Sequence, residues 1–101
     1  MTKHRLGPAS EIEPGKAKKY AVNGNIIAVF NVGGEFHAID DKCPHRGASL
    51  AETGSVEGAV VTCGWHGAEF DVMSGKCLNP IATDLKSYKV VQEGKELFVE
   101  I

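Results

Sequence analysis

The chain has 101 residues, of which 43% are hydrophobic and 24% are charged, and these values are those of one globular domain spanning residues 1–101. Its formal net charge is −2, so it lacks the positive surplus of a nucleic-acid-binding surface, and we expect no nucleic-acid partner. No apolar run approaches the roughly 20 residues that cross a bilayer, and no apolar segment follows the basic start as in a secretion signal. We therefore expect a cytoplasmic protein without membrane attachment, and a monomer.

Short runs of β-branched and aromatic residues, separated by glycine-containing turns, predict strands along most of the chain. The predicted strands are 18–22, 26–32, 36–40, 59–62, 68–72, 76–78, 88–92 and 97–101. In the last of them Leu97, Val99 and Ile101 occupy alternate positions, which is the period of a half-buried strand. Short strands with regular turns predict an all-β fold, a small antiparallel sandwich or barrel.

Two stretches break this rhythm. Residues 41–56 contain few strand formers, apart from a possible single turn of helix at 48–52, and a loop of this length in a small domain is usually functional or disordered. Residues 63–67 form a second irregular loop directly after a predicted strand. We expect the two loops to form a ligand-binding subdomain on the β fold.

Both loops carry metal-binding side chains. They read CPHRG at 43–47 and CGWHG at 63–67, with 17 residues between the first histidine and the second cysteine. One thiolate and one imidazole from each loop suit zinc or an iron–sulfur centre. A C₂H₂ zinc finger pairs its cysteines in one knuckle and its histidines on one helix, which does not match two mixed loops. The pattern favours one [2Fe–2S] cluster bound by Cys43, His45, Cys63 and His66, with structural zinc as the alternative.

The glycines of these loops fit the same interpretation. Gly47, Gly64 and Gly67 would let backbone N–H groups approach the cluster sulfurs and stabilise an added electron. Two ferric irons, two sulfides and two thiolates carry no net charge, whereas four thiolates would leave −2 before reduction. Histidine ligation therefore makes the cluster easier to reduce, which agrees with a role in electron transfer.

The motifs CPHRG and CGWHGAEFD resemble those of the Rieske ferredoxins that serve bacterial ring-hydroxylating oxygenases. The resemblance implies a small antiparallel β domain with the cluster at one tip, Cys43 and Cys63 on the inner iron, and His45 and His66 on the outer iron near solvent. It implies a one-electron carrier, not an enzyme, that passes electrons from a flavin-dependent ferredoxin reductase to a terminal oxygenase. The alternative is a small Rieske subunit of a multi-subunit reductase, such as an assimilatory nitrite reductase.

Four positions depart from the high-potential members of the wider Rieske family. Those members carry an extra disulfide-bonded cysteine in each loop, where this chain has Ala48 and Trp65. They also carry a serine and a tyrosine whose hydroxyls point towards the cluster, where this chain has Ala68 and Phe70. The resemblance therefore implies a low-potential, soluble ferredoxin.

Three further residues could take part in metal or redox chemistry, and for each we expect an ordinary role. His4 is expected to be a solvated terminal residue, His37 a strand residue, and Cys77 a small apolar core residue. The resemblance also implies that Pro80 and Ile81 belong to a third loop that covers the cluster. A simple turn at Pro80 is the alternative.

Overall fold

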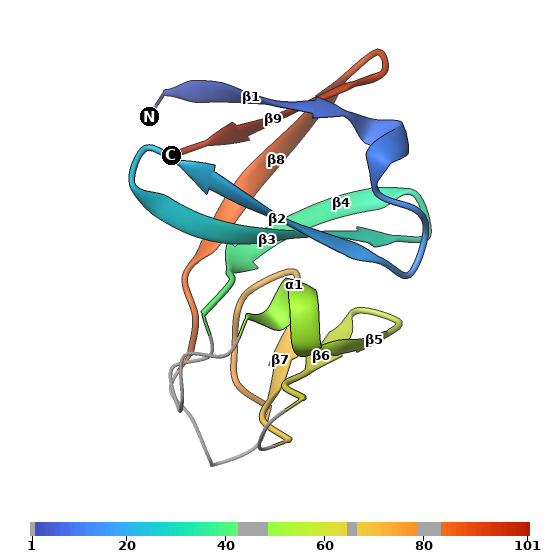
Figure 1. The fold of residues 1–101 in the computed structure, drawn as a ribbon, viewed down its shortest axis with the longest axis vertical. Coiled ribbons are helices and arrows are strands. Elements are labelled where there is room, and N and C mark those ends of the chain that lie inside the picture. Colours follow the sequence, from blue (N-terminus) through green and yellow to red (C-terminus); the bar gives the residue numbers. More distant parts are fainter. Residues whose placement is uncertain (1, 43–48, 65–66, 79–83) are drawn as a thin grey trace.

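The computed structural model describes residues 2–42, 49–64, 67–78 and 84–101, which form two antiparallel sheets (Figure 1). The larger sheet has six strands in the order β1-β9-β8-β4-β3-β2, and the smaller has three in the order β5-β6-β7. The larger sheet contains β1 (Lys3–Pro8), β2 (Ala17–Val22), β3 (Asn25–Val32), β4 (Glu35–Asp40), β8 (Ser87–Glu93) and β9 (Glu96–Glu100). We call this six-stranded sheet the barrel.

The smaller sheet follows a single turn of helix and lies below the barrel in Figure 1. The helix is α1 (Leu50–Thr53), and the strands are β5 (Ser55–Glu57), β6 (Val60–Thr62) and β7 (Glu69–Asp71). We call the described residues from 49 to 78 the small unit. The second predicted loop lies within the small unit, with β6 before it and β7 after it. The small unit is therefore the region that positions the site.

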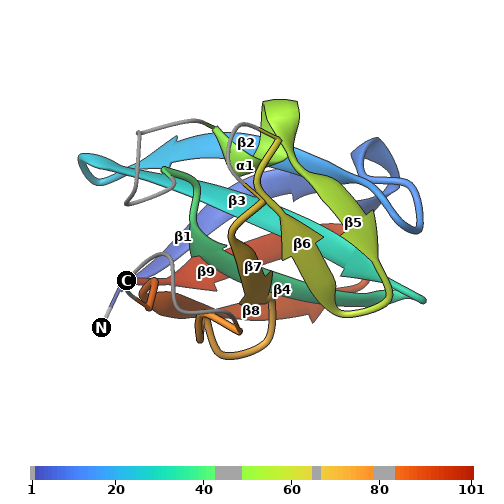
Figure 2. The same ribbon diagram turned by 90° about the horizontal axis from the view of Figure 1, so that it is seen from below.

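The six-stranded sheet curls on itself, and its two edge strands, β1 and β2, are joined by a short link (Figure 2). The link contains the 3-10 turn η1 (Ala9–Glu11) and is fastened by Asn31 of β3. Asn31 is 5% exposed, and its side-chain amide donates to the Ile12 carbonyl oxygen over 2.8 Å and accepts from the Gly34 amide over 2.8 Å. A buried amide needs such partners, so this side chain both closes the link and is itself satisfied.

The barrel and the small unit share strand β3 as a common wall. Ile27 and Val29 belong to the apolar core inside the barrel, whereas Ala28 and Phe30 belong to a second core that includes the small unit. Neighbouring residues of a strand point to opposite faces, which is why a run of buried residues can serve two cores. The small unit therefore folds directly against the barrel.

The all-β antiparallel fold predicted from the sequence is confirmed, and seven of the eight predicted strands are present with ends within one or two residues. The exception is 76–78, which makes only an isolated bridge between Phe70 and Cys77. The Cys77 amide faces away from β7 and donates to the Asp84 carboxylate over 2.8 Å, so no further strand pairs there. The predicted helical turn at 48–52 corresponds to α1, displaced by one or two residues.

Strands β1 and β5 were not predicted. The β1 sequence KHRLGP is polar and contains glycine and proline, and its pairing with β9 includes a register shift between Arg5 and Gly7. The prediction that His4 is a solvated terminal residue was wrong, because His4 is partly buried in β1 opposite Val99. His37 lies in β4, as predicted. No helix within the described ranges is long and apolar enough to cross a membrane.

Candidate metal centre

Of the four predicted ligands, the structure describes Cys63. The three remaining predicted ligands and five of the predicted cluster neighbours lie outside the described residues: Cys43, His45, His66, Gly47, Ala48, Trp65, Pro80 and Ile81. The geometry of the centre therefore follows from Cys63 and from the residues that flank the undescribed segments. These flanks lie close to one another, as the following contacts show.

Cys63 follows directly after β6 and is 2% exposed, in the same apolar core as Val61, Ala68 and Phe70. Its backbone N–H donates to the Ala68 carbonyl oxygen over 2.7 Å, and its carbonyl oxygen accepts from the Gly67 amide over 3.1 Å. Both ends of the second predicted loop are thus held together. Cys63 forms no disulfide, and a buried thiol in a loop fixed in this way fits a ligand that must be kept from water.

Ala68 and Phe70 are both fully buried. They are the two positions at which a hydroxyl would distinguish a high-potential centre. The structure places both in the core that contains Cys63. Because the side chains of alanine and phenylalanine have no hydroxyl, neither residue offers a hydrogen-bond donor there.

Gly64 and Gly67 are needed for different reasons. Gly67 has φ +74°, a left-handed conformation that favours glycine. A Cβ atom on Gly64 would lie 2.3 Å from the carbonyl oxygen of Thr53, so this glycine lets the end of α1 rest against the second loop. The N–H···S bonds expected of these glycines stay a prediction, whereas the contact with Thr53 is a reason for Gly64 that the sequence did not reveal.

The first predicted loop is anchored by Asp41, a buried residue that sequence reasoning missed. Asp41 is 3% exposed. Its Oδ1 accepts from the Ala51 amide over 2.8 Å, and its carbonyl oxygen accepts from the Leu50 amide over 2.8 Å. It therefore satisfies two of the orphan amides at the start of α1. Lys42 forms an isolated bridge with Ser49, so the two ends of segment 43–48 lie side by side.

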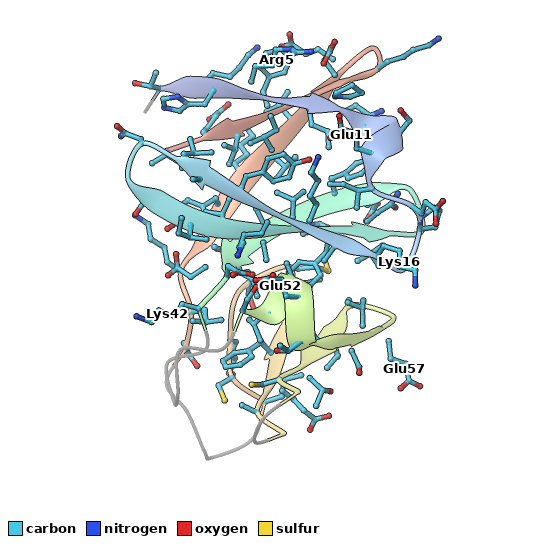
Figure 3. The ribbon with its side chains drawn as sticks, viewed as in Figure 1. Arg5, Glu11, Lys16, Lys42, Glu52 and Glu57 are labelled. Carbon is cyan, nitrogen blue, oxygen red and sulfur yellow. The ribbon has the colours of Figure 1, made fainter. Side chains whose placement is uncertain are left out.

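The helix α1 connects the flanks of the two predicted loops. It begins after Ser49, whose Oγ accepts from the Glu52 amide over 3.2 Å, and it ends where Thr53 meets Gly64. Glu52 faces the barrel, where its Oε1 lies 2.7 Å from the Lys19 ammonium nitrogen (Figure 3). The hydrogen bond to Lys19 lowers the pKa of the Glu52 carboxyl. The helix is thus attached to β2 on one side and to the second loop on the other.

The third flank is formed around Cys77. Cys77 is half-buried and packs against the core of the small unit, as predicted. The Leu78 amide donates to the Glu69 carbonyl oxygen over 2.7 Å, next to β7. Together with the bond between the Cys77 amide and Asp84, this holds both ends of segment 79–83 beside the second loop.

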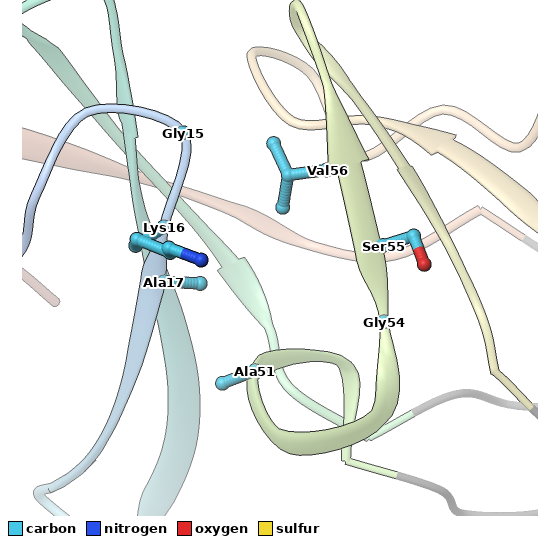
Figure 4. A pocket seen from close by; sticks show the side chains of 7 residues that line it. All are labelled: Gly15, Lys16, Ala17, Ala51, Gly54, Ser55 and Val56. Carbon is cyan, nitrogen blue, oxygen red and sulfur yellow. The ribbon is translucent and has the colours of Figure 1, made fainter.

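A shallow groove of about 390 Å³ separates the barrel from the small unit on another side (Figure 4). It is lined by residues 15–17 of the barrel, by Ala51 and by residues 54–56. Cys63, the predicted ligand that the structure describes, is not among the described residues that line it.

The Rieske [2Fe-2S] domain family matches residues 2–89 of the chain. The chain is 40% identical over 95 residues to the 3-phenylpropionate/cinnamic acid dioxygenase ferredoxin subunit of Escherichia coli (strain K12), covering 93% of this chain and 89% of that protein.

Two solved structures share the fold over nearly their whole length. The ferredoxin of carbazole 1,9a-dioxygenase from Nocardioides aromaticivorans IC177 superimposes with a TM-score of 0.91 at 27% identity, covering 98% of this chain and 97% of that one. A chain from a complex of reduced oxygenase and oxidised ferredoxin in carbazole 1,9a-dioxygenase gives a TM-score of 0.87 at 32% identity, covering 96% and 91%. The predicted cofactor, a single [2Fe–2S] cluster, agrees with this match. By the match over residues 2–89 and by these relatives, the chain belongs to the family of Rieske [2Fe–2S] domains.

Proposed function

We propose that Cys43, His45, Cys63 and His66 bind the [2Fe–2S] cluster and that the chain delivers single electrons to a terminal oxygenase. The observation that carries the proposal is the position of Cys63, a buried thiol in a loop whose two ends are hydrogen-bonded together and which packs against the end of α1. When bound, the cluster supplies one-electron redox chemistry. Zinc, the alternative for these donors, is disfavoured by the family match.

The residues of the chain hold and shield the centre. The thiolate of Cys63 binds from a site that water does not reach, because Val61, Ala68 and Phe70 pack around it. Neutral imidazoles from His45 and His66 would complete the ligand set without adding charge. Electron carriage needs little rearrangement on reduction, and the anchored flanks favour such a rigid site.

The relatives support the proposed acceptor. The E. coli relative is named as a dioxygenase ferredoxin subunit, and a solved relative is described in a complex of oxygenase and ferredoxin. We therefore propose a terminal oxygenase as the acceptor. The resemblance of the loop motifs leads us to propose a flavin-dependent ferredoxin reductase as the donor, with both partners bound transiently by a cytoplasmic, monomeric carrier of one domain. The alternative, a fixed subunit of a reductase, predicts permanent association with a large partner.

The ligand set is tested by metal analysis of purified variants. The wild-type protein should contain about two irons and two labile sulfides per chain, whereas Cys43→Ser, His45→Ala and His66→Ala should each lose the cluster. Cys77→Ala is the matched control and should keep it. One tetrahedral zinc ion in place of iron, or a cluster lost from Cys77→Ala, would overturn the assignment.

The carrier role is tested separately, with the reduced protein mixed with a candidate oxygenase in a stopped-flow instrument. A shuttle is supported if the oxygenase oxidises the cluster of each ferredoxin molecule and then releases it, so that one oxygenase turns over many ferredoxins. Gel filtration should then show a free 10.8 kDa chain. Permanent co-elution with a large partner supports the fixed subunit instead.

A further inference from the structure

A short segment that leads into β8 and includes its first two residues, Ser87 and Tyr88, touches both the barrel and the small unit beside the candidate centre. We call residues 84–88 the strap. We propose that the strap positions the chain that enters the first cluster loop, and that the hydrogen bond from Tyr88 to Asp40 is its fixed point. The proposal rests on the proposed function in one respect, since Asp40 precedes the proposed ligand Cys43 by three residues.

At the barrel end, three hydrogen bonds join the strap to Asp40, the last residue of β4. The Tyr88 hydroxyl donates to Asp40 Oδ1 over 2.6 Å, the Lys86 amide donates to Oδ2 over 3.3 Å, and the Asp40 amide donates to the Lys86 carbonyl oxygen over 2.9 Å. A hydrogen bond to a carboxylate is stronger than one between neutral groups. Asp40 is thus held through its side chain and its backbone at once.

At the other end, the strap crosses the turn that follows β7. The Leu85 amide donates to the Gly75 carbonyl oxygen over 2.7 Å, and a Cβ atom on Gly75 would lie only 2.1 Å from the Leu85 carbonyl oxygen. Asp84 accepts from the Cys77 amide over 2.8 Å. The strap therefore lies against the small unit with almost no space between the two backbones.

These contacts place the strap between two of the three flanks of the centre. Asp40 leads into the first flank at residues 41–42, and Cys77 forms the third flank together with Asp84. In Figure 1 the segment that leads into β8 runs beside the chain that leaves β4. A loosened strap would let these flanks move relative to one another, so the ligands would be held less firmly even in a folded protein.

The chain offers a matched control for the Tyr88 hydroxyl. Tyr20 of β2 is partly buried and packs against the barrel core, but its hydroxyl has no hydrogen-bond partner among the described residues. Tyr88→Phe therefore removes a hydrogen bond, whereas Tyr20→Phe removes only an unpartnered hydroxyl. A second control, Val99→Ala, weakens the barrel core, to which Tyr88 also belongs, but leaves the hydrogen bond between Tyr88 and Asp40 in place.

The test measures loss of visible absorption from the purified holoprotein in excess iron chelator, at a temperature where circular dichroism shows every variant folded. Because the lost bond is to a carboxylate, we expect Tyr88→Phe to bleach about tenfold faster than wild type, with Tyr20→Phe unchanged. Asp40→Ala should bleach like Tyr88→Phe, and the double variant should be no faster than the faster single variant. Amide exchange at Lys86 and Cys77 should accelerate in Tyr88→Phe, with or without cluster.

The outcomes separate this proposal from the proposed function. A wild-type protein without [2Fe–2S] absorption contradicts the proposed function. The amide exchange at Lys86 and Cys77 then tests the role of the strap by itself. A red wild-type protein whose Tyr88→Phe variant bleaches no faster than Tyr20→Phe contradicts the strap alone. The strap is also contradicted if Val99→Ala, at an equal loss of thermal stability, bleaches as fast as Tyr88→Phe, because the effect is then only a general loss of stability.

Discussion

The barrel and the small unit are held together in different ways. The barrel strands have five to eight residues and, except between β4 and β8, pair over most of their length, around a core that includes Ile27, Val29, Leu97 and Val99. The three strands of the small unit have three residues each. Strands so short are marginal on their own. The small unit depends instead on β3 of the barrel, on close backbone contacts at glycines and on single side-chain hydrogen bonds.

The difference shows which part of a small redox domain needs its cofactor. The barrel has a buried core of its own, and we expect it to hold its shape without a ligand, whereas the small unit contains the flanks of the candidate centre. A bound metal centre contributes its binding free energy to the folding of the region that binds it. We therefore expect changes at the centre to loosen the small unit first and the barrel last.

The largest effect is expected from Cys63→Ser, which should remove all of the bound iron. In the resulting protein, amides of the small unit such as Gly67 and Leu78 should exchange rapidly, while those of β3 and β9 stay protected. Hydrogen exchange followed by mass spectrometry or NMR measures both regions in one sample. Equal loss of protection in both regions would show that they unfold as one cooperative unit. It would contradict the expectation that the small unit depends on the centre more than the barrel does.

The next largest effect is expected from Gly64→Ala, because the new Cβ would lie 2.3 Å from the Thr53 carbonyl oxygen. Forcing α1 away from the second loop should lower the free energy of unfolding by about 2–3 kcal/mol and weaken cluster retention. The matched barrel variant is Gly94→Ala, at φ +61° with open space around it, which should cost about 1 kcal/mol and keep the cluster. Urea titration with iron analysis checks both values, and equal cluster retention in the two variants would contradict the role of Gly64.

A third prediction concerns the reduction potential, which should lie nearer roughly −150 mV than +300 mV. Restoring a hydroxyl near the centre stabilises the reduced state more than the oxidised state, so Phe70→Tyr and Ala68→Ser should each raise the potential by about 50–100 mV. Phe98→Tyr in β9 adds a hydroxyl to the barrel and should leave the potential unchanged. Protein-film voltammetry measures all four proteins, and a wild-type value above about +200 mV would contradict the low-potential assignment.

The smallest effect is expected from the Tyr88 hydroxyl at high pH. Burial, and then the hydrogen bond to Asp40, raise the pKa of the Tyr88 hydroxyl above its usual value. The folded state therefore keeps the proton that the unfolded state loses above about pH 10, so the free energy of unfolding should fall as the pH rises beyond that point.

Tyr88→Phe should flatten this decline. Burial also raises the pKa of Tyr20, but without a carboxylate bond, so Tyr20→Phe should flatten it less. Urea unfolding between pH 9 and about pH 12 measures both slopes. A wild-type slope retained in Tyr88→Phe would show that Tyr88 does not hold its proton more firmly in the folded protein.

Much of the barrel could be predicted because its strands carry their period in neighbouring residues. Leu97 and Val99 alternate in the sequence, and both are fully buried in β9. The polar strand β1 has no such pattern and forms because β9 offers unpaired backbone groups along its edge. The same reasoning explains the missed strand β5, three residues long, which forms by pairing with β6.

The sequence by itself determined the all-β class, the family, the cofactor and the ordinary core role of Cys77, because each depends on residue types at short spacings. The assignment of Cys43, His45 and His66 as ligands stays a prediction of that kind. Only the tertiary structure decided that β3 serves two cores, that Gly64 makes room for Thr53, that Asp41 caps α1 and that Tyr88 holds Asp40. These contacts join residues separated by about ten to fifty positions, and no local period or spacing encodes which distant residue the folded chain will bring alongside.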